Sequence, residues 1–288
     1  MKKRVTSLLL AVLSVVCLVL PASAEESGWS AIRLDGEPVY SVEYEIRDGV
    51  CFVTVASFAS LMDPEAAVEE VNGRVSVSAS RVAQVVDVDG SSAGVETENL
   101  TLTVRQGSTY IEANGRCLPV DGVSTINGHA ALPVRLRGQV YNLDVGFDNT
   151  MHSVVLSHRS GAAYLASGDA YYGSDNVLWL SRIINAESGN QSLQGKIAVG
   201  NVVMNRVRSP LFPNTIYDVI FQKNQFGPAA SGSIYKTPNA ESVLAAKLVL
   251  EGVSVVPTAL FFNRAGVACY ASRNRPYITT IGSHAFYG

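Results

Sequence analysis

The sequence predicts a multidomain α+β protein, in which a mainly helical C-terminal domain follows a duplicated, small β-rich α+β module. Three observations predict this fold class. Landmarks of the segment at about 30–80 recur at a constant offset at about 109–159. A stretch rich in Gly, Ser and Ala, residues 161–176, then interrupts the pattern. From Val177 onward the apolar period changes from two residues to 3.6, the period of a helix.

The first residues have the pattern of a secretory signal peptide. Basic residues Lys2–Arg4 precede the apolar run Ser7–Leu20, and Ala22-Ser23-Ala24 matches a small-residue cleavage site. The run is shorter than the ~20 residues that span a bilayer and is followed by Pro21, which favours cleavage over an uncleaved membrane anchor. We expect residues 1–24 to be removed, and the mature chain to be exported without stable membrane insertion.

Composition excludes several classes of function. The 288 residues are 47% hydrophobic with a formal net charge of −3, and no basic tract marks a nucleic-acid binder. Three cysteines follow the predicted cleavage site, Cys51, Cys117 and Cys269, without the spacing of a disulfide framework or a metal site. We expect buried free thiols, with a Cys51–Cys117 disulfide as the alternative, and we expect no metal and no cofactor.

The duplicated module is predicted over residues 25–160. IRLDG at Ile32–Gly36 matches IEANG at Ile111–Gly115, at an offset of 79 residues. Each copy is expected to begin with short strands joined by an Asx-Gly turn. A short helix should follow, over Val55–Met62 in the first copy and Val134–Val140 in the second, and then a closing strand.

Three stretches of this region carry a resemblance to a known family: NGR at Asn114–Arg116, NGHAALPVR at Asn127–Arg135 and VGFDNTMHSVVLS at Val145–Ser157. They resemble the copper amine oxidase N-terminal-like domain, a repeated module of secreted proteins of Gram-positive bacteria. The resemblance implies a binding or spacing module, which would hold the protein at the cell wall. The residues offer no three-histidine copper site, so we do not expect a copper oxidase.

Residues 161–176 are predicted to be a linker, which Tyr164, Tyr171 and Tyr172 can dock against a neighbouring part. The C-terminal domain is predicted over residues 177–288. Its first expected elements are a helix over Val177–Glu187 capped by Ser174 or Asp175, a helix over Leu193–Val207 capped by Ser192, and a short helix over Ile216–Gln222. A loop over Asn224–Ser233 should follow, then a helix that starts at Pro238 with Thr237 as cap and ends just before Gly252, and extended segments at Ala259–Phe262 and Tyr277–Ile281.

Glu187 is the unusual residue of the first of these helices, because it continues the apolar stripe of Leu180, Ile183 and Ile184. A carboxylate against hydrocarbon is disfavoured as an ion, and the helix C-terminus penalises it further, so its pKa should rise. A carboxyl of raised pKa suits a general acid that protonates a glycosidic oxygen. The pattern leaves the alternative open that Glu187 is a surface residue at a frayed helix end.

Residues 177–287 closely resemble the cell-wall hydrolase family of the spore cortex-lytic enzymes. The resemblance is carried by the stretch Leu178–Lys247, by ALFFN at Ala259–Asn263 and by RPYITTIGSHAFY at Arg275–Tyr287. It implies a lysozyme-like, mainly helical fold that cleaves the peptidoglycan bond between N-acetylmuramic acid and N-acetylglucosamine. Its members in spores are associated with lytic transglycosylase action in germination. The glutamate of the family's NAE motif falls on Glu187, which implies that Glu187 is the catalytic acid.

A mechanism with a single carboxyl group fits the remaining acidic residues. Asp218 and Glu241 suit the first turns of helices, and Glu251 sits at a helix end, so none is an evident second catalytic carboxylate. Glu187 would then protonate the leaving oxygen and afterwards take the proton of the sugar's 6-hydroxyl, which closes a 1,6-anhydro ring.

The candidate substrate contacts are residues of late loops and helices that offer amides, rings or charges. For each of them a structural role is the alternative: a loop anchor for Gln225 and Phe226, core packing for Tyr217, and a structural histidine for His284. Many relatives have a larger residue at the position of Gly227. The full set is Gln225, Phe226, Tyr217, Asn205, Asn263, Arg275 and His284.

The sequence as a whole predicts an exported enzyme that acts on peptidoglycan glycan strands, in the cell wall or spore envelope of a Gram-positive-type bacterium. Two alternatives remain open. One is a non-catalytic wall-binding protein with an inactive hydrolase fold. The other is an N-acetylmuramoyl amidase, for which Cys269 and His284 are the available nucleophile–base pair.

Overall fold

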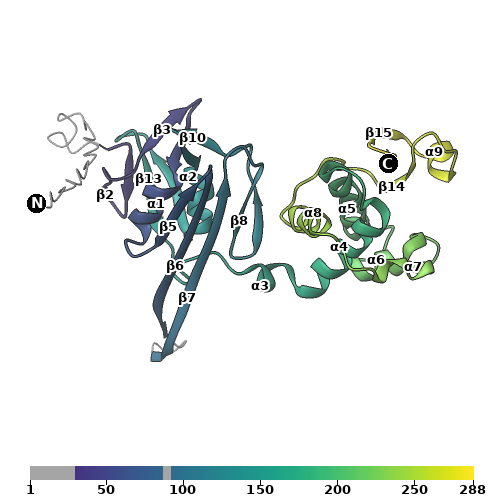
Figure 1. Cartoon of the computed structure of the whole chain (residues 1–288), viewed down its shortest axis with the longest axis horizontal. Coiled ribbons are helices and arrows are strands. Elements are labelled where there is room, and N and C mark those ends of the chain that lie inside the picture. Colours follow the sequence, from purple (N-terminus) through teal and green to yellow (C-terminus); the bar gives the residue numbers. More distant parts are fainter. Residues whose placement is uncertain (1–29, 87–91) are drawn as a thin grey trace, which may run out of the picture.

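The computed structural model describes residues 30–86 and 92–288, and the predicted signal peptide, residues 1–24, lies outside them. Figure 1 shows a β-rich N-terminal part and a mainly helical C-terminal part, joined by the segment that holds α3 (Gly168–Tyr172). None of the described helices is long and apolar enough to cross a membrane.

The N-terminal part is built from thirteen strands and two helices within the described residues. The helices are α1 (Val55–Met62) and α2 (Val134–Val140), with the bounds that the sequence predicts. The strands are β1 (Ile32–Leu34), β2 (Glu37–Pro38), β3 (Tyr44–Arg47), β4 (Val50–Thr54), β5 (Ala67–Val71), β6 (Arg74–Val86), β7 (Ser92–Arg105), β8 (Tyr110–Ala113), β9 (Arg116–Pro119), β10 (Ser124–Ile126), β11 (His129–Pro133), β12 (Leu143–Asp148) and β13 (Ser153–His158).

The two sequence copies share their sheets and one core. Both predicted turns have left-handed backbones, with φ of 51° and 89° at Asp35-Gly36 and of 47° and 78° at Asn114-Gly115. Strand β1 of the first copy pairs in parallel with β13 of the second, and β4 pairs antiparallel with β11. The sheets have the orders β12-β13-β1-β2, β10-β11-β4-β3 and β5-β6-β7-β8-β9. Because strands of one copy complete sheets of the other, one hydrophobic core serves both.

The three cysteines within the described residues have free thiols, as the sequence predicts. Cys51 and Cys117 are buried, and Cys269 is partly exposed. Burial raises the pKa of the Cys51 and Cys117 thiols to about 11, so both stay protonated at neutral pH. The alternative of a Cys51–Cys117 disulfide is wrong.

The predicted linker, residues 161–176, is more ordered than its Gly- and Ser-rich composition suggests. It contains α3, whose start is capped by Ser167, and α4 already begins at Ser174. Tyr164 is buried in the N-terminal core and donates a hydrogen bond to Asp63, at 2.8 Å. The composition misleads because buried tyrosines, rather than an apolar period, fix this segment in place.

The C-terminal part consists of helices and a three-stranded sheet of order β14-β16-β15. Its elements are α4 (Ser174–Ser188), α5 (Leu193–Arg208), α6 (Ile216–Phe221), α7 (Gly227–Ser231), η1 (Ser233–Tyr235), α8 (Ala240–Leu250), β14 (Phe261–Arg264), α9 (Tyr270–Asn274), β15 (Tyr277–Ile281) and β16 (His284–Tyr287).

The helix starts confirm some capping predictions and correct others. Ser192 caps α5, as predicted, and Thr215 caps α6. Asn239, and not Thr237, caps α8, because its side chain accepts the backbone N–H of Ser242. Helix α4 begins after Gly173 without a side-chain cap, so Ser174 and Asp175 do not have the predicted role. The predicted loop over residues 224–233 folds in part into α7.

Two helices pack closely on α5 at Gly200. A Cβ at this position would lie 2.9 Å from Ile184 on α4 and 3.0 Å from Val249 on α8, so only glycine permits this approach. The contact brings the end of α4, where Glu187 lies, against the second half of α5.

The N-terminal part is joined to the C-terminal part by a buried ion pair. Arg116 donates two hydrogen bonds to Glu251, of 2.8 and 2.7 Å, and both side chains are almost completely buried. Tyr172 donates to the same carboxylate at 2.7 Å and accepts the backbone N–H of Cys117 at 2.9 Å. Bidentate geometry and a third donor compensate for the desolvation of the two charges, so this contact fixes β9 against α8.

Candidate active site

Glu187 lies in the last turn of α4, next to Leu180, Ile183 and Ile184, which are fully buried. Its side chain is half-buried and forms part of the wall of a cavity of about 340 Å³. Desolvation raises the pKa of its carboxyl, and the positive charge of Arg206 opposes that rise. The carboxyl therefore keeps its proton to a higher pH than a solvated glutamate does.

The cavity is built by helices on one side and by the C-terminal sheet on the other. Glu187 is the single acidic residue among the described residues that line it. The other lining residues come from α5, from the start of α7, and from β14 and β16: Arg206, Gln225, Phe226, Gly227, Phe262, Asn263, Arg264 and His284. The wall thus offers one carboxyl group, two amides, two phenyl rings, one imidazole and two guanidinium groups.

Arg206 was not predicted from the sequence, although it is the most constrained polar residue of the cavity. It is 4% exposed, and its Nε donates to the carbonyl of Leu260 at 2.8 Å, whereas Nη1 is buried and has no partner among the described residues. Its guanidinium lies 5.0 Å from the ring centres of both Phe212 and Phe226. Desolvation lowers the pKa of Arg206 to about 10, and the attraction of Glu187 opposes that change, so the group is charged at neutral pH.

The sequence does contain a signal for Arg206. Val199, Val202 and Val203 are fully buried on α5, and Arg206 continues their stripe at a spacing of three or four residues. This is the same pattern that singles out Glu187 on α4. A charged residue on an apolar stripe therefore marks the cavity on both α4 and α5.

His284 lines the cavity from β16 and lacks a partner for one ring nitrogen. Nδ1 is buried and unpaired within the described part of the chain, and the ring packs edge-on against Phe262 with centroids 5.3 Å apart. Desolvation lowers the pKa of His284, so the imidazole is neutral at pH 7. Nδ1 therefore lacks the hydrogen bond that the alternative of a structural histidine would require, and it borders the cavity where a ligand could bind.

Gln225, Phe226 and Asn263 also lie where a ligand of the cavity would meet them. Phe226 is 4% exposed and forms a floor between Arg206 and Phe262. Gly227 borders the same space, and a Cβ built there meets no atom within 4 Å. A larger side chain at this position would project into open space, so glycine widens the entrance here.

Three predicted substrate contacts do not line the cavity. The side-chain amide of Asn205 donates to the carbonyls of Val256 and Ala259, each at 2.9 Å, so it serves the backbone. Arg275 lies over the ring of Phe261, 5.0 Å from its centre. Tyr217 is 48% exposed and packs on Phe221 and Trp179, so it is not the core residue of the alternative.

The other carboxylates of the C-terminal part have partners elsewhere. Asp218 accepts a hydrogen bond from the hydroxyl of Thr215 at 2.6 Å, and Glu241 pairs with Lys196. Glu251 is not merely a residue at a helix end, because it forms the buried ion pair with Arg116. Across the described residues, no group of three or more His, Cys, Asp or Glu side chains is arranged to hold a metal ion.

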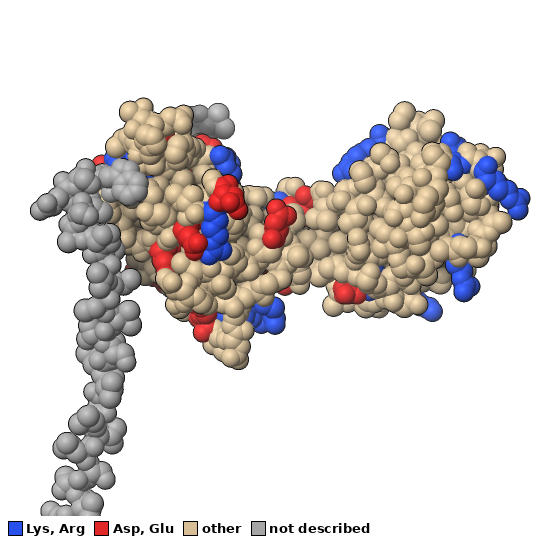
Figure 2. All heavy atoms as spheres, turned by 90° about the horizontal axis from the view of Figure 1, so that it is seen from above, with Lys and Arg blue, Asp and Glu red and all other residues tan. Residues whose placement is uncertain are grey.

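Charge is distributed unevenly over the molecule. Residues 177–288 contain ten Lys or Arg and four Asp or Glu, although the whole chain is weakly acidic. Figure 2 shows more basic than acidic side chains on the visible face of the C-terminal part. This part therefore presents a cationic surface around the cavity to its ligands.

Comparisons with known proteins agree on the C-terminal part. Residues 190–287 match the Cell Wall Hydrolase family model. A spore cortex-lytic enzyme of Bacillus cereus is 34% identical over 116 residues, which cover 40% of this chain and 45% of that protein. A spore cortex-lytic enzyme of Bacillus subtilis is 30% identical over 129 residues, covering 44% of this chain and 42% of that protein.

One of the matched solved structures is the catalytic domain of the germination-specific lytic transglycosylase SleB from Bacillus anthracis. It is 31% identical, with a TM-score of 0.39, and the match covers 41% of this chain and 97% of that domain. The chain spans less than half the length of the two spore cortex-lytic enzymes above. The C-terminal region of this chain is a cell wall hydrolase domain, and its homologues include spore cortex-lytic enzymes.

Proposed function

We propose that this protein is an exported peptidoglycan-cleaving enzyme in which Glu187 is the catalytic acid. The observation that carries the proposal is a carboxyl group of raised pKa in the wall of a cavity, with no second carboxylate among the described lining residues. The cell wall hydrolase domain and the spore cortex-lytic homologues support peptidoglycan as the substrate. The cationic surface of residues 177–288 suits a polymer whose peptides carry carboxylates.

The bond that we propose is cleaved joins N-acetylmuramic acid to N-acetylglucosamine. Glu187 donates its proton to the oxygen between the two sugars as the C1–O bond breaks. Arg206 stabilises the carboxylate that this leaves, because its charge favours the ionised form of Glu187. The amides of Gln225 and Asn263 offer hydrogen bonds to an N-acetyl group or a hydroxyl.

The second half of the proposed reaction needs no water. The substrate's own N-acetyl group stabilises the positive centre at C1. The Glu187 carboxylate then takes the proton of the 6-hydroxyl while that oxygen forms a bond to C1, which yields a 1,6-anhydro sugar and restores the acid. One carboxyl group thus performs both proton transfers, in agreement with the lining of the cavity. This is a lytic transglycosylase reaction.

The proposal extends to the rest of the chain. The predicted signal peptide would export the protein, and the β-rich part over residues 25–160 would hold it at the cell wall or spore envelope. The buried contact of Arg116 with Glu251 supports such a role, because it couples this part firmly to the catalytic domain over residues 177–288.

The test is to incubate purified peptidoglycan with the wild type, Glu187→Gln and the control Asp218→Asn, and to analyse soluble products by mass spectrometry. Asp218 is an exposed carboxylate outside the cavity, so its variant should match the wild type. We expect 1,6-anhydro muropeptides from these two proteins, and a rate about 10²–10⁴-fold lower from Glu187→Gln.

Other products would contradict specific parts of the proposal. Reducing-end muramic acid in place of anhydro products would indicate hydrolysis instead of transglycosylation. Intact glycan strands with released peptides would indicate an amidase. A wild type that releases nothing but sediments with the wall would indicate a non-catalytic binding protein. Equal rates for the wild type and Glu187→Gln would assign the acid to another residue.

A further inference from the structure

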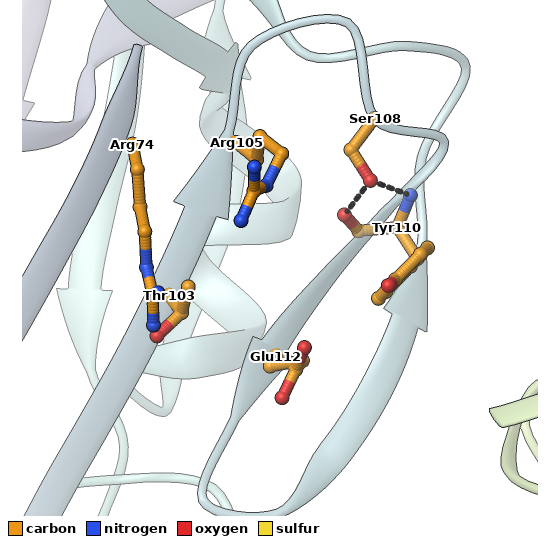
Figure 3. A pocket seen from close by; sticks show the side chains of 6 residues that line it. All are labelled: Arg74, Thr103, Arg105, Ser108, Tyr110 and Glu112. Atoms are coloured by element: carbon orange, nitrogen blue, oxygen red, sulfur yellow. Dashed lines mark hydrogen bonds between the residues drawn. The ribbon is translucent and has the colours of Figure 1, made fainter. Parts of the chain in front are cut away.

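A small hollow on the N-terminal part presents an arrangement of charges that the proposed reaction does not use. It measures about 130 Å³ and lies on the sheet formed by β6, β7 and β8 (Figure 3). Its lining residues are Arg74, Thr103, Arg105, Ser108, Tyr110 and Glu112. The space is too small for a glycan strand and fits the end of a peptide.

The two arginines form one wall of the hollow. Arg74 on β6 and Arg105 on β7 are direct cross-strand partners, and both are exposed. Like charges directly opposite each other on a sheet are unfavourable. Within the described part of the chain, neither guanidinium forms an ion pair or a hydrogen bond, so no direct contact offsets this repulsion. Two adjacent guanidinium groups with free donors match the geometry of a carboxylate.

The opposite wall carries a negative charge. Glu112 on β8 is exposed, faces Thr103 across the strands and forms no ion pair with a described residue. In Figure 3 the Glu112 and Tyr110 side chains lie across the hollow from Arg74. The hollow thus holds two separate cations and one anion. A ligand with a carboxylate and an ammonium group can satisfy both walls, whereas a phosphate group would meet repulsion from Glu112.

The frame of the hollow is fixed by backbone contacts. The hydroxyl of Ser108 donates to the carbonyl of Tyr110 at 2.8 Å and accepts its N–H at 3.3 Å (Figure 3). The ring of Tyr110 also packs against the hydrophobic core of the C-terminal part. Tyr110 therefore anchors one wall of the hollow beside the catalytic domain.

We propose that this hollow binds the zwitterionic end of a short peptide, with its carboxylate between Arg74 and Arg105 and its ammonium group at Glu112. Stem peptides of peptidoglycan carry free carboxylates and amines, so this ligand class rests on the proposed function of the chain. The site recognises peptide and not sugar. It would hold the peptide part of the wall next to the domain that cleaves the glycan part.

The experiment is a titration of the mature chain with D-alanyl-D-alanine, followed by calorimetry and by NMR shifts of the residues around the hollow. The probes that isolate each charge are the N-acetylated dipeptide, the C-terminally amidated dipeptide and inorganic phosphate. Two variants are compared: a double variant that combines Arg74→Gln with Arg105→Gln, and the single variant Glu112→Gln. The matched control is Arg159→Gln, an exposed arginine of the same part that pairs with Asp144. All positions are on the surface, and thermal unfolding checks that each variant folds.

We expect the dipeptide to bind and to shift the resonances of Arg74, Arg105 and Glu112. The double arginine variant should weaken binding at least tenfold, the effect of losing about 1.5 kcal/mol or more of charge-assisted hydrogen bonding. Glu112→Gln should weaken binding of the free dipeptide but not of the N-acetylated one, and Arg159→Gln should leave both unchanged. Amidation should weaken binding to the wild type as strongly as the double arginine substitution does.

Several results would overturn the assignment: no binding of the dipeptide, equal binding by the double arginine variant, or tighter binding of phosphate than of the dipeptide. The last would point to a phosphate-bearing polymer. Cleavage of peptide-free glycan by the same variants separates this inference from the proposed function. If that cleavage depends on Glu187 while the dipeptide fails to bind, only the peptide site is wrong. If the dipeptide binds as expected and no glycan is cleaved, the catalytic proposal is wrong.

Discussion

Arg137 and Arg206 are both buried, one in the core of the N-terminal part and the other in the wall of the cavity beside Glu187. Desolvation lowers the pKa of each guanidinium to about 10. Each donates one hydrogen bond of 2.8 Å to a backbone carbonyl, Arg137 to Val55 and Arg206 to Leu260. Each also has buried nitrogen atoms without a partner among the described residues.

The surroundings of the two arginines differ in one respect that matters for function. Arg137 is completely buried beside the rings of Phe58 and Tyr141, and no described carboxylate forms an ion pair with it. Arg206 faces a carboxyl group and an open cavity. A buried charge is thus not in itself a sign of a site. An unpaired donor that shares a cavity with a group of perturbed pKa is such a sign.

Of the substitutions that compare these buried arginines, Arg206→Met is expected to have the largest effect. We expect the rate of peptidoglycan cleavage to fall by about 10²-fold, because a charge that stabilises the Glu187 carboxylate is lost. The same loss raises the pKa of Glu187 further, so the protonated acid persists to higher pH and the alkaline limb of the pH–rate profile moves up. Arg206→Lys keeps the charge and should leave this limb near its wild-type position. If the alkaline limb of Arg206→Met stays at its wild-type position, the proposed electrostatic coupling between Arg206 and Glu187 is wrong.

A large effect on stability is expected where a buried arginine has a partner. In Glu251→Ala the Arg116 guanidinium stays buried without its carboxylate, which should lower the free energy of unfolding by about 3 kcal/mol. Limited proteolysis should then cut the segment between the two parts faster than in the wild type. An unchanged unfolding temperature and cleavage rate would show that the ion pair does not hold the two parts together.

A smaller effect of opposite sign is expected for Arg137→Met. This substitution removes a desolvated, unpaired charge and keeps apolar volume between the two rings, so the free energy of unfolding at pH 7 should rise by about 1 kcal/mol. The pKa of Arg137 is lowered in the folded state, so the penalty is complete at neutral pH and is relieved only as pH rises past about 10. Peptidoglycan cleavage should not change. A loss of several kcal/mol would instead show that the bond to Val55 outweighs desolvation.

The smallest effect is expected from His284→Gln, and it depends on pH. The pKa of His284 is lowered in the folded state by desolvation, so folding favours the neutral imidazole. Wild-type stability should therefore decrease as pH falls below about 6.5, the ordinary pKa of histidine, and this decrease should be smaller in the variant. Denaturant unfolding at pH 7.5 and at pH 5 measures the difference. Parallel curves for the two proteins would mean that His284 is solvated.

Local patterns predict much of this fold but only part of its cavity. The apolar period of α4 identifies Glu187, and the bounds of α1, α2 and β15 agree with those expected from sequence. Arg206 also continues an apolar stripe, as Glu187 does. A basic residue in the last turn of a helix is, however, expected from the helix dipole alone, so the sequence does not reveal that Arg206 is buried.

The remaining cavity residues depend on contacts that are distant in the sequence. Phe262 and His284 reach the cavity because β14 pairs with β16, and a short-range pattern does not specify how that sheet packs on the helices. Asn205 and Arg275 looked equally suitable in the sequence, but backbone carbonyls and the ring of Phe261 engage them instead. The type of a polar residue alone does not show whether its side chain contacts a ligand or holds other parts of the protein in place.

The pKa of Glu187 in the folded protein tests the central claim most directly. It can be measured by NMR titration of the side-chain carboxyl carbon in protein labelled at glutamate, with the signal assigned by its absence in Glu187→Gln. We predict a pKa above the value of about 4.5 for an unperturbed glutamate, and a higher one still in Arg206→Met. A pKa at or below 4.5 in the wild type would mean that the cavity does not favour the protonated carboxyl, and would contradict the assignment of Glu187 as the proton donor.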